Sequence, residues 1–271
     1  IGRVTRPGLP VAPGNPAINP VPLRMIRAAA APWVKTGRTL CLLISAPDGE
    51  RTARETWNPR LGVEGGISLI GTSGVVEPKS TRAFRASIAL CVRQAALLGR
   101  KSIIVTLGHV GESFLEKRGI GPEARVVAGD HVCFALERCA AGGMSRILLA
   151  GHVGKLAKVA AGLFDTHWSS GDARLETLAA CAAACGARRD TVRHLLSLST
   201  AEAAESVIRS EGLEAAYDFL AARAAGRMKD AAGRGKKIDA ETGCVVLSLD
   251  GTLLGAFPEN LKGEESWQSF R

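Results

Sequence analysis

Aromatic residues are scarce in this 271-residue chain: phenylalanine, tryptophan and tyrosine together make up 4% of it, with a single tyrosine. Proteins that bind single-stranded nucleic acid stack bases on aromatic side chains, so the scarcity argues against that role. Long apolar runs are missing as well. A run such as Ser102 to Leu107 is far shorter than the ~20 residues that span a bilayer, and no signal sequence opens the chain. We therefore expect a cytoplasmic protein with no membrane partner and no nucleic-acid partner.

The residue patterns of several enzyme classes are also absent. The seven cysteines form an odd set without a Cys-x-x-Cys pair, so we expect free, buried thiols rather than disulfides or metal ligands. The five histidines lack the spacing of zinc proteases. Gly-x-Ser-x-Gly does not occur, and Gly154-Lys155 lacks the rest of a Walker phosphate loop. These absences argue against a serine hydrolase, a nucleotide kinase and a protein-bound metal.

Positive charge is in excess, because 35 Lys and Arg residues face 26 Asp and Glu residues for a net charge of +9. The first sixty residues hold nine basic and three acidic residues, a net charge of +6. A basic cleft concentrates any polyanion, whether nucleic acid or a small molecule with several carboxylates. The shortage of aromatic residues favours the small molecule.

Proline dominates the start of the chain, with nine of the twelve prolines in the first sixty residues. Because each proline fixes φ and biases the preceding residue, Pro7 to Pro22 is predicted to be an ordered extended loop or a linker and not helix. The interleaved Val11, Ile18 and Val21 favour the ordered loop. A short helix over 23–31 and a strand over 38–45 are expected next. The glycine-rich stretch 58–74 is typical of a ligand-binding loop. A helix is predicted from its N-cap Ser80 to Gly99.

From Lys101 onward the pattern alternates between strands and helices. Strands are predicted at 102–107, 125–127 and 146–150, and helices at 111–117, 130–141 and 152–164. This alternation is typical of a parallel, doubly wound sheet. Three or four Ala-rich helices should follow between 171 and 225, one of them opened by a capping box of Ser199 and Glu202. Asp250-Gly251 predicts a hairpin.

The sequence Gly-His-Val-Gly occurs twice, at 108–111 and 151–154, each time between a predicted strand and a predicted helix. A tight turn by itself accounts for glycine at such a place. Parallel strands, however, end at one edge of the sheet, where open α/β folds bind ligands, so two such turns favour a ligand site. Helix N-termini at this edge suit the carboxylate of a ligand that also carries ribose and adenine.

Several stretches, in order along the chain, closely resemble the CbiD family, cobalt-precorrin-5B (C1)-methyltransferase of anaerobic cobalamin biosynthesis. They are Val4–Pro10 with Pro16–Pro22, Asn58–Ser68, Gly71–Pro78, Gly151–His167 and Asp172–Glu176. The resemblance covers most of 2–187 and is less distinctive afterwards. The family normally begins well upstream with a Thr-Thr-Gly-Thr-Cys-like segment, so we expect an N-terminal segment to be missing. The family's Pro-Gly-Asn-x-Gly turn is here Leu107-Gly108-His109-Val110-Gly111.

The resemblance implies methyl transfer from S-adenosylmethionine to C1 of cobalt-precorrin-5B, giving cobalt-precorrin-6A. The acetate and propionate arms of this corrinoid would suit the basic first sixty residues. The implied fold is α/β and CbiD-like: an α+β substrate-binding domain (1–99), a Rossmann-like parallel-sheet domain that binds S-adenosylmethionine (100–226), and a C-terminal hairpin and tail (227–271). Transfer of an already activated methyl group needs chiefly alignment and exclusion of water. Oligomeric state is left open, with a homodimer as one option.

The resemblance also implies roles for individual residues, each with a structural alternative. Lone arginines are commonly solvated, asparagine before proline commonly caps a turn, and Lys155 and Asp172 have a salt bridge and a helix cap as alternatives. Near C1 we expect Thr72, Ser73 and Glu77. For the donor we expect Gly108, His109, Gly111, Glu112, Gly151, His152 and Gly154. For the substrate we expect Arg3, Arg6, Asn19, Arg24, Asn58, Arg60, Lys155, His167 and Asp172.

Three other functions stay open at this point. The altered turn at 107–111 is compatible with a non-catalytic corrinoid carrier, or with a C1-methyltransferase that acts on a cobalt-free precorrin. The basic first segment also leaves nucleic-acid binding as a third option, which would show a steep salt dependence.

Overall fold

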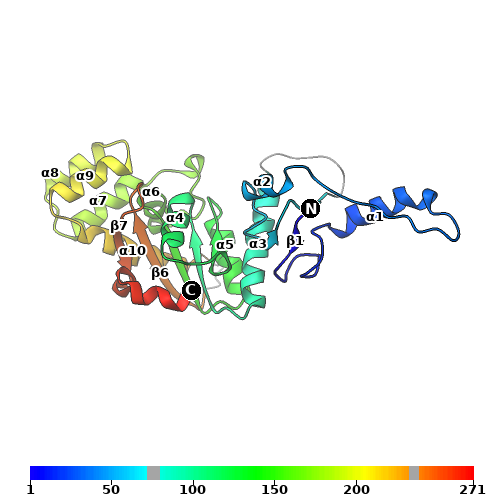
Figure 1. The fold of residues 1–271 in the computed structure, drawn as a ribbon. Coiled ribbons are helices and arrows are strands. Elements are labelled where there is room, and N and C mark those ends of the chain that lie inside the picture. Colours follow the sequence, from blue (N-terminus) through cyan, green and yellow to red (C-terminus); the bar gives the residue numbers. More distant parts are fainter. Residues whose placement is uncertain (72–79, 232–237) are drawn as a thin grey trace. The chain divides into compact units, whose positions relative to one another are not determined.

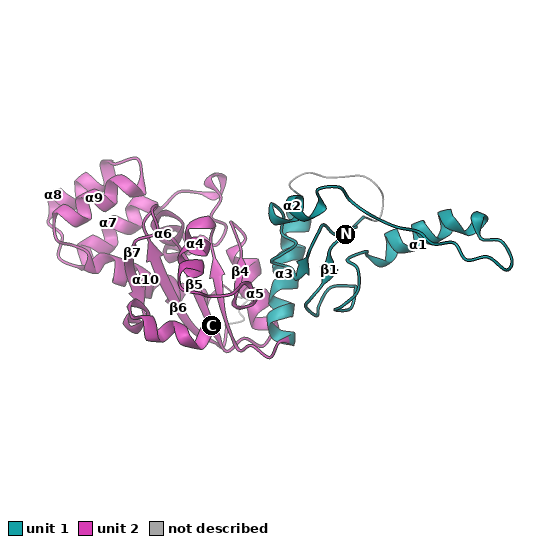
Figure 2. Ribbon diagram, viewed as in Figure 1, with its two compact units in different colours: residues 1–97 teal, residues 98–271 magenta. Residues whose placement is uncertain are grey.

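The computed structural model describes residues 1–71, 80–231 and 238–271, so the predicted Thr72, Ser73 and Glu77 lie outside the described residues. The chain divides into two compact units, residues 1–97 and 98–271 (Figures 1 and 2). The C-terminal hairpin, expected to form a third part, belongs to the second unit. No helix in the described ranges is both long and apolar enough to cross a membrane.

The first unit is built on a small core. Strand β1 (Arg3–Val4) pairs antiparallel with β2 (Val63–Glu64), and Val4 and Val63 lie opposite each other in this ladder. Both valines are buried together with Ala17, and Leu9 and Val11 of the proline-rich segment pack against them. Residues far apart in the sequence therefore form this core.

The proline-rich segment is ordered, as predicted. Its backbone bonds to both sides of the core: Ala17 N donates to Gly2 O at 2.7 Å, and Asn19 N donates to Leu69 O at 3.0 Å. The prediction that it excludes helix is wrong at its end, because α1 (Pro20–Ala30) begins at Pro20. Prolines are accepted in a first helical turn, where the missing N–H has no helical partner anyway. A 3₁₀ turn, η1 (Ala31–Trp33), follows.

The predicted strand over 38–45 is not formed. This stretch has no ladder partner in the part of the chain that the structure describes, and Leu43 is 93% exposed. A strand needs a neighbour for its backbone groups, and an apolar composition alone does not supply one. The short helix α2 (Gly49–Arg54) comes next.

Helix α3 (Thr81–Leu97) agrees with the sequence pattern. Ser80 caps it, because its Oγ accepts a hydrogen bond from Ala83 N at 3.3 Å. Ile88 and Val92 lie on its buried face. Gly99 follows the helix with φ +76°, a conformation that favours glycine.

The second unit contains a five-stranded sheet in the order β4-β3-β5-β6-β7. The strands are β3 (Ser102–Thr106), β4 (Arg125–Val127), β5 (Arg146–His152), β6 (Glu241–Leu247) and β7 (Leu253–Phe257). The first four are parallel, which confirms the predicted parallel sheet. Strand β7 is antiparallel to β6, since the short turn at Asp250-Gly251 can join only antiparallel neighbours.

Both faces of this sheet are buried, which explains why its strands are continuously apolar. Ile104 and Leu148 belong to a core cluster with Phe114 of α4 and with Trp267 and Phe270 of the C-terminal 3₁₀ turns. Helix α10 packs against α6, β6 and β7. The helices are α4 (His109–Lys117), α5 (Val132–Ala141), α6 (Val153–Ala161), α7 (Arg174–Ala184), α8 (Arg189–Ser197), α9 (Ala201–Ser210) and α10 (Ala215–Met228); the 3₁₀ turns are η2 (Pro122–Ala124), η3 (Trp168–Ser170), η4 (Glu259–Lys262) and η5 (Glu264–Phe270).

The capping residue of α9 differs from the prediction. Thr200, not Ser199, has the extended backbone of an N-cap, and its Oγ1 accepts a hydrogen bond from Ala203 N at 3.2 Å. Glu202 is therefore in the first turn but not at the third position that a capping box requires. Its carboxylate instead faces a histidine of the site described below.

Strand order reverses at β3, because the chain runs from β3 to β4 on one side and then returns to β5 on the other. The gap between the helices that follow β3 and β5 is the switch point of a doubly wound sheet, where ligands bind outside the carboxyl ends of the strands. Both Gly-His-Val-Gly sequences begin there.

Candidate functional site

The two Gly-His-Val-Gly turns lie side by side at the switch point. Thr106 pairs with Ala150 in the ladder, and Leu107 N donates to Ala150 O at 3.2 Å. Between the turns lies a cavity of about 190 Å³, here called the switch-point cavity. Its lining residues are Leu107, Gly108, His109, Val110, Gly111, His152, Lys155 and Leu249.

The glycines of these turns have packing reasons of their own. Gly108 has φ +149°, and a Cβ on Gly111 would lie 2.5 Å from Ala150 O. A Cβ on Gly151 would lie 3.1 Å from Leu107 Cβ. Gly111 therefore lets α4 approach β5, and glycine at these positions is not by itself evidence of a ligand.

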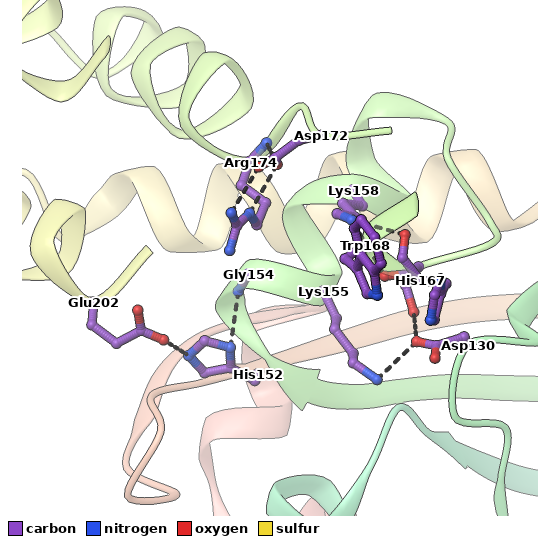
Figure 3. Close-up of a pocket in the computed structure, with 11 residues that line it drawn as sticks. Asp130, His152, Gly154, Lys155, Lys158, His167, Trp168, Asp172, Arg174 and Glu202 are labelled. Carbon is purple, nitrogen blue, oxygen red and sulfur yellow. Dashed lines mark hydrogen bonds and ion pairs between the residues drawn. The ribbon is translucent and has the colours of Figure 1, made fainter. Parts of the chain in front are cut away.

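A second cavity, of about 360 Å³, adjoins the first through His152 and Lys155 (Figure 3). We call it the polar cavity, because most of its lining side chains are charged or hydrogen-bonding. It draws on the end of β4, on α6, on the loop that leads to η3, and on the starts of α7 and α9. The lining residues are Asp130, His152, Gly154, Lys155, Lys158, Thr166, His167, Trp168, Asp172, Arg174 and Glu202.

His152 links two helices at one end of the polar cavity. Its Nδ1 accepts a hydrogen bond from Gly154 N at 3.3 Å and so caps α6, while Nε2 lies 3.2 Å from Glu202 Oε1. Burial lowers the pKa of His152, and the Glu202 carboxylate opposes that effect only in part. The ring is therefore neutral at pH 7 and carries its proton on Nε2. Nε2 faces the Glu202 carboxylate without forming a hydrogen bond in the described part of the chain. Because Nδ1 is occupied by the cap of α6, His152 is placed to hold the start of that helix and not to act as a general base.

Asp130 occupies the opposite end of the polar cavity, after β4. Its Oδ1 accepts hydrogen bonds from Thr166 Oγ1 at 2.7 Å and from Lys155 Nζ at 3.0 Å. Burial alone would raise the pKa of Asp130, but these two hydrogen bonds and the Lys155 charge hold it below its usual value. The carboxylate is therefore ionised at neutral pH. The salt-bridge alternative for Lys155 is thus realised, while Lys155 also lines both cavities.

The loop before η3 is tied to α6 by a buried lysine. Lys158 Nζ donates to the backbone carbonyls of Thr166 at 3.3 Å and His167 at 3.2 Å. His167 caps η3, since its Nδ1 accepts from Ser169 N at 3.3 Å. The predicted substrate residue His167 therefore has a structural role at the rim of the cavity.

Asp172 and Arg174 form a two-pronged ion pair at the start of α7. Arg174 Nε and Nη2 lie 2.8 and 2.7 Å from the two carboxylate oxygens, and Arg174 N donates to Oδ1 at 3.1 Å. The side-chain hydrogen bonds from Arg174 lower the pKa of Asp172 to about 2. The N-cap of α7 is Ala173, so Asp172 is not the helix cap that its structural alternative proposed. It binds the first residue of the helix from just before the cap and also lines the polar cavity.

The arginines expected to bind substrate lie in the first unit, and two of them brace loops. The Arg6 guanidinium donates to Arg60 O at 3.2 Å, and Arg3 donates to Gly14 O. Arg60 lies over the Trp57 ring at 5.3 Å, and Arg24 is exposed on α1. Substrate binding by these four residues stays a prediction.

Asn19 and Asn58 line a third cavity, of about 460 Å³, which lies wholly within the first unit. Its other lining residues are mostly apolar, among them Val4, Leu61 and Ile67. Asn58 Oδ1 accepts a hydrogen bond from Ser68 Oγ at 3.0 Å. The structure thus brings these two predicted residues together, apart from the cavities of the second unit.

Comparison with known proteins agrees with the family resemblance. The family model described as CbiD matches residues 1–78, and the model described as CbiD, C-terminal domain, matches residues 165–258. The protein named cobalt-precorrin-5B C(1)-methyltransferase of Moorella thermoacetica is 44% identical over 257 residues, covering 94% of this chain and 69% of the relative. The chain belongs to the CbiD family. The second model extends the family match well beyond residue 187, where the sequence motifs became less distinctive.

Other members of the CbiD family are similar to this chain. The protein of the same name from Thermoanaerobacter sp. is 42% identical over 213 residues, which is 79% of this chain and 58% of the relative. The chain therefore spans between 58% and 69% of the length of these two relatives. A crystal structure of a cobalamin biosynthesis protein (cbiD) from Archaeoglobus fulgidus shares 30% identity over 44% of this chain and 38% of that one, with a TM-score of 0.23.

Some site residues of this CbiD-family chain were not predicted, and some predicted ones lie elsewhere. Glu112 is buried on α4 and lines neither cavity of the second unit, and Gly151 is likewise not a lining residue. A usable signal existed for Asp130, because a polar residue just after a parallel strand lies at the ligand-binding edge. In the polar cavity the residues missed are Asp130, Lys158, Thr166, Trp168, Arg174 and Glu202, and in the switch-point cavity they are Leu107, Val110 and Leu249. Within the described ranges, no group of three or more His, Cys, Asp or Glu side chains is arranged to hold a metal ion.

Proposed function

We propose that this chain catalyses S-adenosylmethionine-dependent methyl transfer to C1 of cobalt-precorrin-5B, giving cobalt-precorrin-6A. A relative that carries this activity in its name is 44% identical to the chain over 257 residues. The observation that carries the proposal is the meeting of both Gly-His-Val-Gly turns around the switch-point cavity, where a doubly wound sheet binds its ligand.

The methyl donor fits the two adjoining cavities of the second unit. Helix α4 begins at the switch-point cavity with Gly108 as its N-cap, a residue without a side chain, so its first-turn N–H groups suit the donor's carboxylate. This cavity of about 190 Å³ is smaller than the ~300 Å³ lower limit of typical ligand pockets. The polar cavity, reached past His152 and Lys155, supplies the remaining room.

The corrinoid substrate suits the charge of the first unit. Its carboxylate arms would be attracted by the excess of six positive charges in residues 1–60, including Arg24 and Arg60. Because the donor's methyl group is already activated, catalysis asks mainly for alignment and exclusion of water. A reaction of this kind needs little acid-base catalysis, which agrees with a site whose histidine His152 caps a helix. A cytoplasmic location and catalytic roles for Thr72, Ser73 and Glu77 remain predictions from the sequence.

Filling the switch-point cavity tests this function. Leu249 lines the cavity and is 59% exposed, so Leu249→Trp adds bulk there without disturbing the core. Leu196 on α8 is 49% exposed and lies away from the cavity, so Leu196→Trp is a matched control. We expect Leu249→Trp to weaken binding of S-adenosylhomocysteine at least ~10-fold in calorimetry, about 1.4 kcal/mol, and Leu196→Trp to leave it unchanged.

The reaction itself is followed with methyl-labelled S-adenosylmethionine and cobalt-precorrin-5B, with mass spectrometry of the corrinoid. Label should appear in the corrinoid with the wild-type chain and fall with Leu249→Trp. A folded wild-type chain that gives neither heat with the donor product nor label transfer would exclude the methyltransferase function. Running the same reaction on the metal-free precursor distinguishes a cobalt-free substrate from the cobalt-containing one.

A further inference from the structure

Asp130 and Trp168 form the end of the polar cavity that lies away from Glu202 (Figure 3). Strand register brings Asp130 to the same edge as the first turn. Thr106 pairs with Val127, and Ala128 N donates to Thr106 O at 2.8 Å, so the chain leaves β3 and β4 at the same level. In doubly wound folds, an acidic residue roughly 20 residues after the glycine turn accepts hydrogen bonds from a ribose. Asp130 stands in that relation to Gly108.

Asp130 is held in place through one of its two oxygens. Both Thr166 Oγ1 and Lys155 Nζ bond to Oδ1, and no hydrogen bond to Oδ2 is formed within the ranges that the structure describes. The carboxylate is thus oriented by the protein and still has an oxygen to offer. A charged acceptor forms the stronger class of hydrogen bond, and the vicinal hydroxyls of a ribose are suitable donors.

Trp168 supplies a flat apolar surface at the same end. It begins η3 and is 81% exposed, which leaves most of its ring to solvent. The loop that carries it is nevertheless anchored, because Lys158 bonds to the carbonyls of Thr166 and His167, and Thr166 bonds to Asp130. Figure 3 shows Trp168, His167 and Asp130 on the same side of the polar cavity, away from Glu202. An anchored, exposed indole can stack on a purine base.

We propose that the Asp130–Trp168 end of the polar cavity binds the nucleoside part of the methyl donor: Asp130 accepts hydrogen bonds from the ribose hydroxyls, and Trp168 stacks on the adenine. This inference rests on the proposed function and adds the residues that select an adenosine-bearing ligand. The methionine part then extends past Lys155 toward the switch-point cavity, since Lys155 lines both.

Calorimetry with S-adenosylhomocysteine and with its analogue lacking both ribose hydroxyls tests the ribose contact. We expect Asp130→Asn to weaken binding of S-adenosylhomocysteine by about 10- to 100-fold. The analogue should bind the wild-type chain more weakly by a similar factor, and Asp130→Asn should weaken the analogue no further. This double comparison isolates the contact between the carboxylate and the hydroxyls from any general disturbance of Lys155 or Thr166. Asp190→Asn, on the exposed start of α8, is the control.

The adenine contact is tested with Trp168→Ala, which should lower affinity for S-adenosylhomocysteine at least ~5-fold, with Trp168→Phe retaining part of it. Trp33→Ala, which removes a tryptophan that is 74% exposed in the first unit, should bind like the wild-type chain. Binding should also change the tryptophan emission of the wild-type chain and much less that of Trp168→Phe. Thermal melts establish that each variant is folded.

The outcomes separate this inference from the proposed function. If the wild-type chain binds S-adenosylhomocysteine but Asp130→Asn and Trp168→Ala bind it equally well, the nucleoside subsite is wrong and the function stands. If Asp130→Asn weakens the analogue as much as S-adenosylhomocysteine, Asp130 does not contact the ribose, and the inference is overturned. If the folded wild-type chain binds neither compound, both the proposed function and the nucleoside subsite are wrong.

Discussion

Gly111 offers a sharp test of why glycine recurs in these turns. It lies in the first turn of α4, and a Cβ there would be 2.5 Å from Ala150 O and 3.2 Å from Thr106 Cβ. Real Cβ atoms do not approach a carbonyl oxygen that closely, so Gly111→Ala forces α4 away from β5. Strand β5 cannot yield, because it is bonded to β3 on one side and β6 on the other.

The magnitude follows from two opposing effects. Replacing a helical glycine by alanine stabilises a helix by about 0.5–1 kcal/mol when the site is open. Overpacking a tight contact costs about 1–3 kcal/mol, and here the crowded atom is backbone. Gly226 in α10 provides the matched control, because its added Cβ would meet nothing within 4 Å. Gly111→Ala should therefore lower the free energy of unfolding of the second unit, and Gly226→Ala should raise it by up to ~1 kcal/mol.

Urea unfolding followed by circular dichroism measures both variants against the wild-type chain. For a unit of this size, ~1 kcal/mol moves the melting temperature by about 2–4 °C, so thermal melts give a second reading. A Gly111→Ala chain that is as stable as the wild type, while Gly226→Ala shows its gain, would refute the close approach of α4 to β5. Glycine at 111 would then need a ligand to explain it.

Two further predictions concern titratable groups. Arg174 holds the pKa of Asp172 at about 2, below its usual value of 3.8, so the ion pair stabilises the fold above about pH 4 and this stability is lost as the pH falls toward 2. The pair is half-exposed, so Asp172→Asn should lower the free energy of unfolding at pH 6 by less than about 1 kcal/mol. This difference between the variant and the wild-type chain should shrink between pH 4 and pH 2. A difference that grew over that range would contradict the assignment. Burial raises the pKa of Cys139 to about 12 and also raises that of Cys244, whereas Cys41 is exposed. Ellman's reagent at pH 8 should therefore modify Cys41 first and reach Cys139 and Cys244 only in denaturant; rapid reaction of all seven thiols in the native chain would be the contrary result.

Sequence patterns by themselves determined the parts of this protein that depend on neighbouring residues. The N-cap Ser80, the hairpin at Asp250-Gly251 and the alternation of strands and helices after Lys101 all appear as predicted. Each of these features is decided within a few residues, by capping, by φ or by side-chain periodicity. The motifs that indicate the CbiD family are likewise short stretches of neighbouring residues, and the family models confirm them.

Tertiary structure alone decided which elements become neighbours. The stretch 38–45 has the composition of a strand but no partner in the described part of the chain. The strand order β4-β3-β5 places both Gly-His-Val-Gly turns, which are far apart in the chain, at one edge of the sheet. The same order brings Asp130 to that edge. Backbone pairing and burial act between segments that are distant in the sequence. A local sequence pattern therefore does not predict which distant segment will pair with a given strand. The sequence therefore contains the residues of the site in separate segments, and the strand order of the sheet brings these segments to one edge.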